Sequence, residues 1–258
     1  MTKIHPTALV DPHAELGTGV EVGPFAVIES DVQIGDNCEI HSHVKVSSGT
    51  RLGEGVIAHQ GAVLGSAPQD LKYKDEKTYL EIGDKTVVRE YATINRGTDY
   101  NWKTEIGKNC LLMAYVHVAH DCILGNNVII ANSVQMAGHV VIEDFVGVGG
   151  LTAIHQFVHI GKHAFIGGGF RIIKDVPPFI LAMGEPLQFG GLNSVGLTRR
   201  GFTQEQLLEM KRAYKTIYRS NFTRTEALDH LRNAFAPSPI ISDIADFLEK
   251  SDRGLIKG

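Results

Sequence analysis

Two adjacent residues near the middle of the chain, His120 and Asp121, could do acid–base chemistry. A histidine beside a carboxylate that holds its tautomer can serve as a general base, worth about 10²- to 10⁴-fold in rate. Gly138 lies further along the chain, and its backbone N–H, if brought beside the base, could stabilise an oxyanion, worth about 10²- to 10³-fold. We interpret His120 as the base, Asp121 as its orienting residue and Gly138 as the oxyanion donor.

More polar residues share one spacing. The interval from His120 to Gly138 recurs from Asp121 to His139 and from Gly138 to Gln156, and His117 and His155 are close in sequence. Surface histidines are mostly just solvated, but their recurrence here favours a site. His117, His120 and His139 could instead hold zinc, as in hexapeptide-repeat carbonic anhydrases, although Asp121 fits such a set poorly. We therefore predict neither a metal nor a cofactor.

The frame that must position these residues is a repeat of six. An aliphatic residue recurs at the first position from Ile4 to Ile172, often followed by Gly, and the fifth position is small. This pattern is typical of a parallel β-helix, in which three sixes form a coil of about 18 residues and coils stack about 4.8 Å apart. His120 and Gly138 are three sixes apart, so they should lie one above the other.

Two polar stretches, Ser66 to Glu81 and Gly97 to Glu105, interrupt the repeat, and we expect them to form loops. The repeat fails after Ile172, where Pro177 and Pro178 should stop strand addition. We expect a β-helix over residues 1–186 and a small helical domain over residues 187–258.

Helical patterns begin at Thr203, Thr223 and Ser238. The first two open capping boxes with Gln206 and Glu226, so we expect three helices that pack on the β-helix or on a neighbouring subunit. A basic stretch in this region suits an acidic partner, or is only a solvated face: Arg199, Arg200, Lys211, Lys215 and Arg219.

The composition is that of an ordinary globular protein, with 43% hydrophobic residues, 21% charged residues and a net charge of −4. It suggests neither nucleic-acid binding nor membrane insertion, and without a signal-like start we expect a cytoplasmic protein. Cys38, Cys110 and Cys122 all fall at the small fifth position, so we expect buried thiols rather than disulfides or a zinc site.

Several motifs resemble those of the UDP-N-acetylglucosamine O-acyltransferases of lipid A biosynthesis. They are His-Val-Ala-His-Asp-Cys at 117–122, Ala-Gly-His-Val at 137–140, Ala-Ile-His-Gln-Phe at 153–157, Gln-Asp-Leu-Lys-Tyr at 69–73, Asp-Val-Pro-Pro at 175–178 and Arg-Arg-Gly-Phe at 199–202. The resemblance implies a left-handed coil, although about 98% of parallel crossovers are right-handed. It also implies a homotrimer with its active sites between subunits.

By this resemblance, a 3-hydroxyacyl chain moves from acyl carrier protein to the 3-position of UDP-N-acetylglucosamine without a covalent intermediate. His120, Asp121 and Gly138 match the base, its orienting residue and the oxyanion amide. Gly168 matches a ruler of acyl-chain length, and the basic stretch matches the surface that meets acyl carrier protein. Positions matching substrate contacts are Asp70, Lys72, His117, His139, His155, Gln156, Asn193 and Arg200.

Two positions depart from the family pattern. Asn95 stands where members often have His, and Val195 where a Glu often faces the nucleotide. Some relatives acylate a 3-amino sugar, so ester and amide products both remain open, as does the length of the acyl chain. A non-catalytic solenoid that binds a nucleotide sugar is a further alternative.

Overall fold

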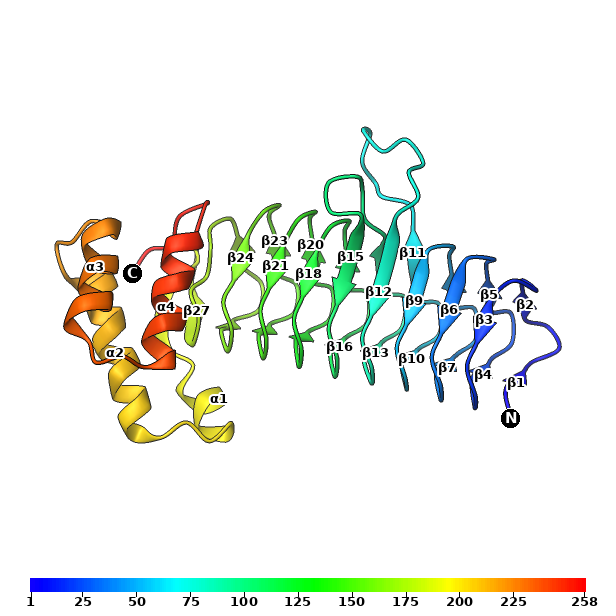
Figure 1. Cartoon of the computed structure of the whole chain (residues 1–258), viewed down its shortest axis with the longest axis horizontal. Coiled ribbons are helices and arrows are strands. Elements are labelled where there is room, and N and C mark those ends of the chain that lie inside the picture. Colours follow the sequence, from blue (N-terminus) through cyan, green and yellow to red (C-terminus); the bar gives the residue numbers. More distant parts are fainter.

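The computed structural model describes residues 1–258 and has the expected fold class, a left-handed parallel β-helix followed by a small helical part (Figure 1). Three sheets form the walls of the β-helix. The eleven-stranded sheet contains β1 (Lys3–Ile4), β4 (Glu21–Val22), β7 (Glu39–Ile40), β10 (Ile57–Ala58), β13 (Val87–Val88), β16 (Leu111–Leu112), β19 (Ile129–Ile130), β22 (Gly147–Val148), β25 (Phe165–Ile166), β27 (Ile180–Met183) and β28 (Gln188–Leu192).

The other two walls are a nine-stranded and an eight-stranded sheet. The nine-stranded sheet contains β2 (Leu9–Val10), β5 (Val27–Ile28), β8 (Lys45–Val46), β11 (Val63–Ser66), β14 (Thr93–Asn95), β17 (His117–Val118), β20 (Gln135–Met136), β23 (Ala153–Ile154) and β26 (Arg171–Ile172). The eight-stranded sheet contains β3 (Glu15–Leu16), β6 (Val32–Ile34), β9 (Thr50–Leu52), β12 (Tyr79–Ile82), β15 (Lys103–Ile106), β18 (Ile123–Leu124), β21 (Val141–Ile142) and β24 (His159–Ile160).

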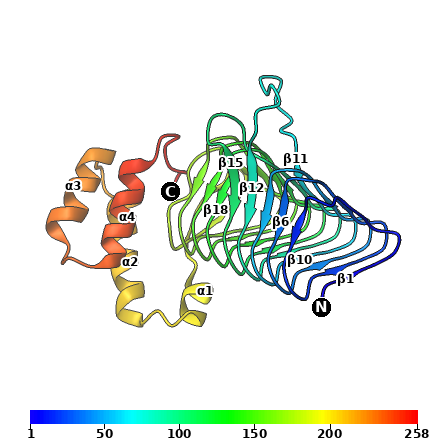
Figure 2. The same cartoon turned by 45° about the vertical axis from the view of Figure 1, so that its right-hand side comes forward.

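Strand pairing confirms that a regular coil is three sixes long, for example at His117 opposite Gln135. Val63 pairs with Thr93, which is five sixes further on, and Thr93 pairs with His117, four sixes further on. The two interruptions therefore add whole sixes to their coils, which is why the repeat resumes in phase. They are shorter than expected, because β12 and β15 begin inside them, and both loops project from the same side of the β-helix (Figures 1 and 2).

The first and fifth positions of the repeat fill the interior, as expected. Cys38, Cys110 and Cys122 are buried free thiols within this column of side chains. Burial raises the pKa of Cys122 to about 12. Ile4 is an exception, 47% exposed, because no further coil covers the first one.

The expectation that Pro177 and Pro178 stop strand addition is wrong. β27 follows them and pairs in parallel with β25, and β28 then pairs antiparallel with β27. The prolines occupy a corner between strands, where the ladder needs no N–H from them, and pairing resumes when Phe179 N donates to Lys162 O. The proposed domain boundary between residues 186 and 187 lies in the turn between β27 and β28.

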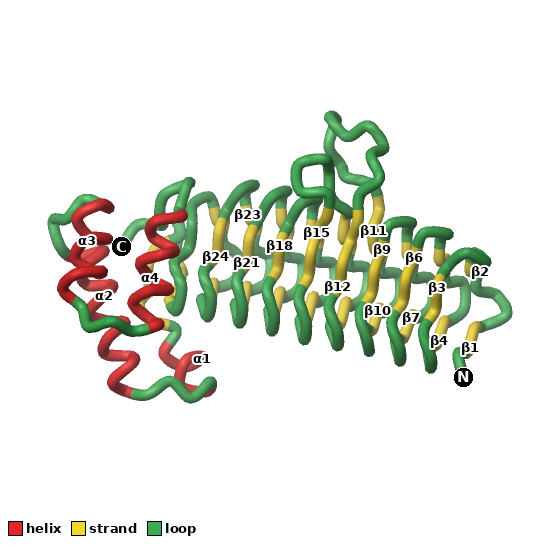
Figure 3. Tube along the Cα trace, in the orientation of Figure 1, coloured by secondary structure: helices red, strands yellow, loops and turns green.

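Four helices follow rather than three: α1 (Ser194–Arg199), α2 (Gln204–Arg219), α3 (Arg224–Ala234) and α4 (Pro239–Lys250), drawn in red in Figure 3. The short α1 was not expected. Both capping boxes are present, at Thr203 with Gln206 and at Thr223 with Glu226. None of the helices is long and apolar enough to cross a membrane.

The helices pack on the last coils of the β-helix, at the end opposite the N-terminus (Figure 1). Tyr214 of α2 is buried, and its hydroxyl donates to the carbonyl of Pro178. From α4, Asp243 accepts from Lys162 Nζ at 2.7 Å and the ring of Phe247 lies 4.5 Å from that of His159. These contacts fix the helical part onto the β-helix within one chain.

Candidate active site

His120 and Asp121 lie in the corner that follows β17, on the edge of the β-helix between the nine- and eight-stranded sheets. We call this the His120 edge. The corner needs a residue with positive φ in each coil, and Asp121, His139 and Phe157 take that conformation at φ values of 59°, 62° and 62°. Because their side chains leave neighbouring coils at equivalent points, they form a column on this edge.

The expected pairing of base and carboxylate is present. Nδ1 of His120 lies 2.7 Å from Oδ2 of Asp121, and the Asp121 side chain is fully shielded from solvent. Burial alone would raise the pKa of Asp121, but hydrogen bonds from His120 and Thr98 outweigh it and hold the pKa below its ordinary value. An ionised carboxylate can only accept, so Nδ1 carries the proton and Nε2 is the basic nitrogen.

Gly138 lies one coil beyond His120, and its position against the imidazole matches the stacking argument. A Cβ at Gly138 would fall within 3.2 Å of three atoms of the His120 ring. The N–H of Gly138 donates no hydrogen bond within the chain. A free amide therefore lies beside the ring that carries the candidate base.

His139 is held by aromatic rings. It stacks on Phe157 with ring centroids 4.4 Å apart, and the edges of Tyr100 and His120 approach it at 4.5 and 5.0 Å. Burial lowers the pKa of His139, against the opposing effect of Asp121. Its buried Nδ1 has no hydrogen-bond partner and lies 3.8 Å from Oδ2 of Asp121, so one polar atom of this ring is left unsatisfied within the chain.

His117 lies on the same wall as His120. Its Nδ1 is 2.8 Å from Oγ1 of Thr93, which fixes the ring. Burial, and then the neighbouring His120, lower the pKa of His117. A neutral imidazole of this kind can donate or accept a hydrogen bond with a bound ligand.

The remaining expected contacts on this edge are more open. His155 and Gln156 are exposed one coil beyond Gly138. Asp70 and Lys72 lie in the loop between β11 and β12, and Asp70 is close enough to His139 to influence its pKa. The structure thus brings Asp70 near the column.

That loop is tied down at its base. Arg96 donates to the hydroxyl of Tyr73 at 2.9 and 3.1 Å and to the carbonyl of Gly65 at 3.0 Å. The buried Asn95 donates to the carbonyl of Ala67 at 3.1 Å. Asn95 therefore shapes the loop that carries Asp70 and Lys72.

Asn193 and Arg200 lie on a different edge, the one that follows the eight-stranded sheet. Asn193 caps α1 and donates to the carbonyl of His163, while the Arg200 guanidinium lies 5.4 Å from the centre of the Phe145 ring. Both line a cavity of about 560 Å³ together with apolar residues such as Phe165. One chain alone does not bring these two residues to His120.

The alternative zinc set of His117, His120 and His139 does not form. The ligand atoms that lie within 4.8 Å of one another belong to His120, Asp121 and His139. Each oxygen of Asp121 already accepts two hydrogen bonds, from Thr98 and Asn101 N–H groups on one and from the Thr98 hydroxyl and His120 on the other. A carboxylate with this many donors is a poor metal ligand.

The basic side chains are exposed, and within the chain none forms an ion pair: Arg199, Arg200, Lys211, Lys215 and Arg219. Lys211, Lys215 and Arg219 recur at every fourth position of α2, so they share one face of that helix. This leaves a row of uncompensated positive charge on the helical part.

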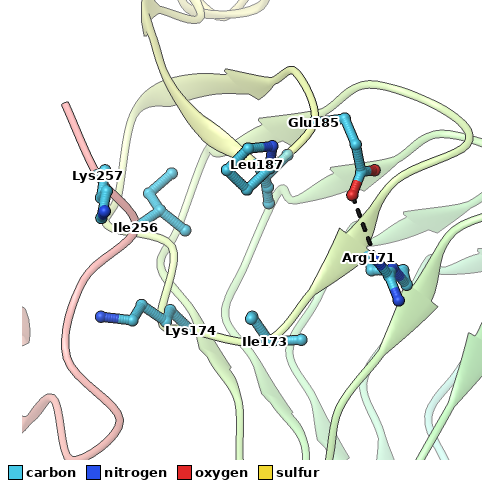
Figure 4. Close-up of a pocket in the computed structure, with 8 residues that line it drawn as sticks. Arg171, Ile173, Lys174, Glu185, Leu187, Ile256 and Lys257 are labelled. Atoms are coloured by element: carbon cyan, nitrogen blue, oxygen red, sulfur yellow. Dashed lines mark hydrogen bonds and ion pairs between the residues drawn. The ribbon is translucent and has the colours of Figure 1, made fainter.

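Gly168 lies in a corner against the preceding coil, where a Cβ would come 2.9 Å from the carbonyl oxygen of Gly150. Close stacking of the coils thus requires glycine here, and its part as a ruler stays a prediction. A separate cavity of about 330 Å³ lies at the end of the nine-stranded sheet and contains none of the expected site residues (Figure 4). Arg171, Lys174 and Lys257 surround it, with Leu187 and Ile256 among its apolar lining.

Some residues of the site were not found from the sequence, namely Thr98, Tyr100, Thr93 and Phe157. Phe157 follows His139 by one coil, so the repeat could have revealed it. Thr98 and Tyr100 lie in the second loop and Thr93 comes before it. Because that loop adds residues to the chain, none of these three residues is one regular coil length away from the residue that it contacts.

Two family models match the chain, in three segments. A model described as "Udp N-acetylglucosamine O-acyltransferase; Domain 2" matches residues 175–256, and one described as "Bacterial transferase hexapeptide (six repeats)" matches residues 13–48 and 103–138. The C-terminal match begins at Asp175, inside the last coil, and the other two fall within the β-helix.

Curated relatives match over nearly their whole length. An acyl-[acyl-carrier-protein]–UDP-N-acetylglucosamine O-acyltransferase from Chlorobaculum tepidum is 59% identical over 248 residues, which cover 96% of this chain and 94% of the relative. The protein of the same description from Halorhodospira halophila is 46% identical over 258 residues, all of both chains.

Solved structures show the same fold. The UDP-N-acetylglucosamine acyltransferase of Bacteroides fragilis superimposes with a TM-score of 0.96 at 42% identity, covering 98% of this chain and 100% of its own. The relative from Acinetobacter baumannii gives the same TM-score and identity, with coverage of 98% and 99%. Full-length identity and a matching fold lead to one conclusion: the chain belongs to the UDP-N-acetylglucosamine O-acyltransferase family.

Proposed function

We propose that the chain transfers a 3-hydroxyacyl group from acyl carrier protein to the 3-hydroxyl of UDP-N-acetylglucosamine, the first step of lipid A biosynthesis. Full-length relatives that carry this activity in their names support the substrates. The observation that carries the proposal is the position of His120, which touches the Asp121 carboxylate and lies against Gly138 of the next coil.

The reaction follows from that geometry. Nε2 of His120 takes the proton of the sugar 3-hydroxyl while the sugar oxygen bonds to the thioester carbonyl carbon. The N–H of Gly138 donates to the developing oxyanion, and the Asp121 carboxylate stabilises the imidazolium that forms. When the C–S bond breaks, the imidazolium returns its proton to the leaving thiol, so no covalent enzyme intermediate is needed.

We also propose a homotrimer whose active sites lie between subunits. Asn193 and Arg200, the expected contacts for the nucleotide, lie on a different edge from His120. A neighbouring subunit that presents this edge to the His120 edge would complete the site. In the same way, the unpaired cations of α2 would receive the acidic carrier protein. The cytoplasmic location stays a prediction.

The test is His120→Ala, assayed with 3-hydroxyacyl carrier proteins and both UDP-N-acetylglucosamine and its 3-amino analogue, with products read by mass spectrometry. We expect turnover to fall at least about 10³-fold, because the imidazole that would act as the general base is removed. His13→Ala, at an exposed histidine of the first coil, is the control and should behave as wild type.

The same assay separates the alternatives. Ester formation only with the first sugar supports the proposal, and an amide with the second would identify the 3-amino substrate. UDP-sugar binding without acyl transfer by the wild-type protein would instead indicate a non-catalytic solenoid. Wild-type rates in His120→Ala would exclude His120 as the base.

A further inference from the structure

We propose that Thr98 is a positioning residue for catalysis, which fixes the Asp121 carboxylate in the orientation that holds His120. This inference rests on the proposed function of His120 as the base. Thr98 makes no hydrogen bond to the imidazole; it hydrogen-bonds Asp121 and acts on His120 through that carboxylate.

Thr98 contacts both oxygens of the carboxylate. Its backbone N–H donates to Oδ1 of Asp121 at 2.9 Å and its hydroxyl donates to Oδ2 at 2.6 Å. Two donors from one residue fix the plane of the carboxylate, because rotation about the bond to the carboxyl group would break one bond or the other. The remaining lone pair of Oδ2 then points to Nδ1 of His120 at 2.7 Å.

The direction of the Thr98 hydroxyl is itself fixed. Its oxygen accepts the N–H of Tyr100 at 3.2 Å, so the hydroxyl proton is left for Asp121. Thr98 is only 6% exposed, and water has little access with which to replace this contact. The hydroxyl is therefore committed to one donor and one acceptor.

The second loop folds around the same carboxylate. The N–H of Asn101 also donates to Oδ1 of Asp121, at 3.3 Å, and the N–H of Trp102 donates to the carbonyl of Thr98 at 2.8 Å. Tyr100, which lies between Thr98 and Asn101 in the sequence, places its ring against His139. Loop and carboxylate thus fix one another, and Thr98 makes the shortest of the contacts.

The electrostatics of the pair agree with this arrangement. Burial favours the neutral form of Asp121, yet its pKa is lowered, and Thr98 supplies two of the hydrogen bonds responsible after that of His120. An ionised Asp121 is what keeps the proton of His120 on Nδ1.

The experiment compares Thr98→Val, which keeps the shape but removes the hydroxyl, with Thr98→Ser, which keeps the hydroxyl. Thr98→Ala is made alongside, so that a failure of the valine to fit does not decide the result. Each trimer is assayed for kcat and for KM of both substrates, and the ¹⁵N spectrum of its histidine side chains reports the tautomer of His120.

The matched control is Thr86→Val. Thr86 is buried as well, and its hydroxyl accepts from Cys110 N at 3.1 Å and donates to the carbonyl of Gly107 at 2.8 Å, with no hydrogen bond to the site. It therefore loses the same kinds of hydrogen bond as Thr98→Val. A change that both variants share reports folding, and a change confined to Thr98 reports positioning.

We expect the valine and alanine variants to lose about 10- to 100-fold in kcat, the range typical of removing a partner that orients a functional side chain. KM should stay within about threefold, the Nδ1–H signal of His120 should be lost or mixed, and Thr98→Ser should restore kcat to within about threefold. Thr86→Val should lower the melting temperature and leave kcat unchanged.

Wild-type kcat in both variants without the hydroxyl, or a serine variant as slow as valine, would overturn the role of Thr98. An equal loss of kcat in Thr86→Val would also do so. His120→Ala in the same assay keeps the two proposals apart. If that variant is inactive while Thr98→Val is normal, only the role of Thr98 fails; if it is active, His120 is not the base.

Discussion

Gly138 leaves no room for a side chain beside His120. A Cβ at position 138 would lie 2.7 Å from Cε1 and 2.9 Å from Nε2 of the imidazole, far inside ordinary contact distance. Because that space is empty, the backbone of one coil approaches the ring presented by the coil before it. The relationship links the repeat length directly to the chemistry.

The first prediction follows from this contact. Gly138→Ala should push the imidazole away from the place where Nε2 meets the sugar, and lower kcat about 10²-fold or more. Gly150→Ala is the matched control, since Gly150 also precedes the positive-φ residue of a corner but a Cβ there would meet only Asn132 O, at 3.0 Å, and more distant atoms. Kinetics and melting curves of both variants are the measurement, and equal kcat values would contradict the assigned geometry.

Regular spacing is what made the site predictable. An interval of one coil placed Gly138 against His120 and His139 beside Asp121, and strand pairing bears this out at His117 and Gln135. Such arithmetic works in a β-helix because each coil contacts only its neighbours.

The arithmetic fails where the coil length changes. Thr98 and Asp121 are in contact, as are Thr93 and His117, although neither pair is separated by the regular coil length, because the second loop contains Thr98 and follows Thr93. No periodicity marks a loop residue that folds back on the frame. The prediction that Pro177 and Pro178 stop strand addition failed for a related reason. Proline does interrupt the hydrogen bonding of a strand, but these two prolines lie in a corner between strands.

The second prediction concerns the shared site. His120→Ala and Arg200→Ala should each be inactive or strongly impaired, since one lacks the proposed base and the other the proposed nucleotide contact. Co-expressed, they should form mixed trimers in which about one site in three takes an intact His120 and an intact Arg200 from different subunits. Activity of the purified mixed trimers is the measurement. No recovery would place both residues in the same chain's site.

The third prediction concerns the face of α2 that carries Lys211, Lys215 and Arg219. Lys215→Glu should raise KM for the acyl carrier protein about tenfold at low salt and leave KM for the UDP-sugar unchanged, because it adds repulsion on the face proposed to receive the acidic carrier protein. Added salt should reduce the difference between the variant and wild type in KM for the acyl carrier protein. Lys85→Glu makes the same charge change in the β-helix, and a similar rise in that variant would show a general charge effect instead of a docking face.

The fourth prediction concerns the end of the chain. The buried carboxylate of Asp175 accepts from His159 N at 2.9 Å, Ser251 Oγ at 2.7 Å and Arg253 N at 3.2 Å. Asp175→Ala should lower the free energy of unfolding by about 2–4 kcal/mol, because several donors lose their acceptor in a buried place. Faster amide exchange at Ile256 would show that the segment after α4 is released from the β-helix. The exposed Asp252 offers the control, and an equal loss in Asp252→Ala would contradict the assignment.

The last prediction is a dependence of stability on pH at His163. Its ring lies between Phe145 and Phe179, with centroids 4.8 and 5.6 Å away, and its buried Nδ1 has no partner. Burial, assisted by Arg200 and Lys162, lowers the pKa of His163 to about 4 from 6.5. Between those values the unfolded chain binds the proton and the folded chain does not, so stability should rise with pH and be lost as pH falls from 6.5 to about 4.

His163→Phe keeps the stacked ring and removes the titrating group, so its melting temperature should fall less than that of wild type over this range. Melting curves between about pH 4 and pH 7 give the comparison, and the difference between the two proteins cancels the shared effect of the carboxylates. His5→Phe, at an exposed position of the first coil, should follow wild type. Parallel curves for wild type and His163→Phe would mean that His163 takes up its proton equally in the folded and unfolded chains.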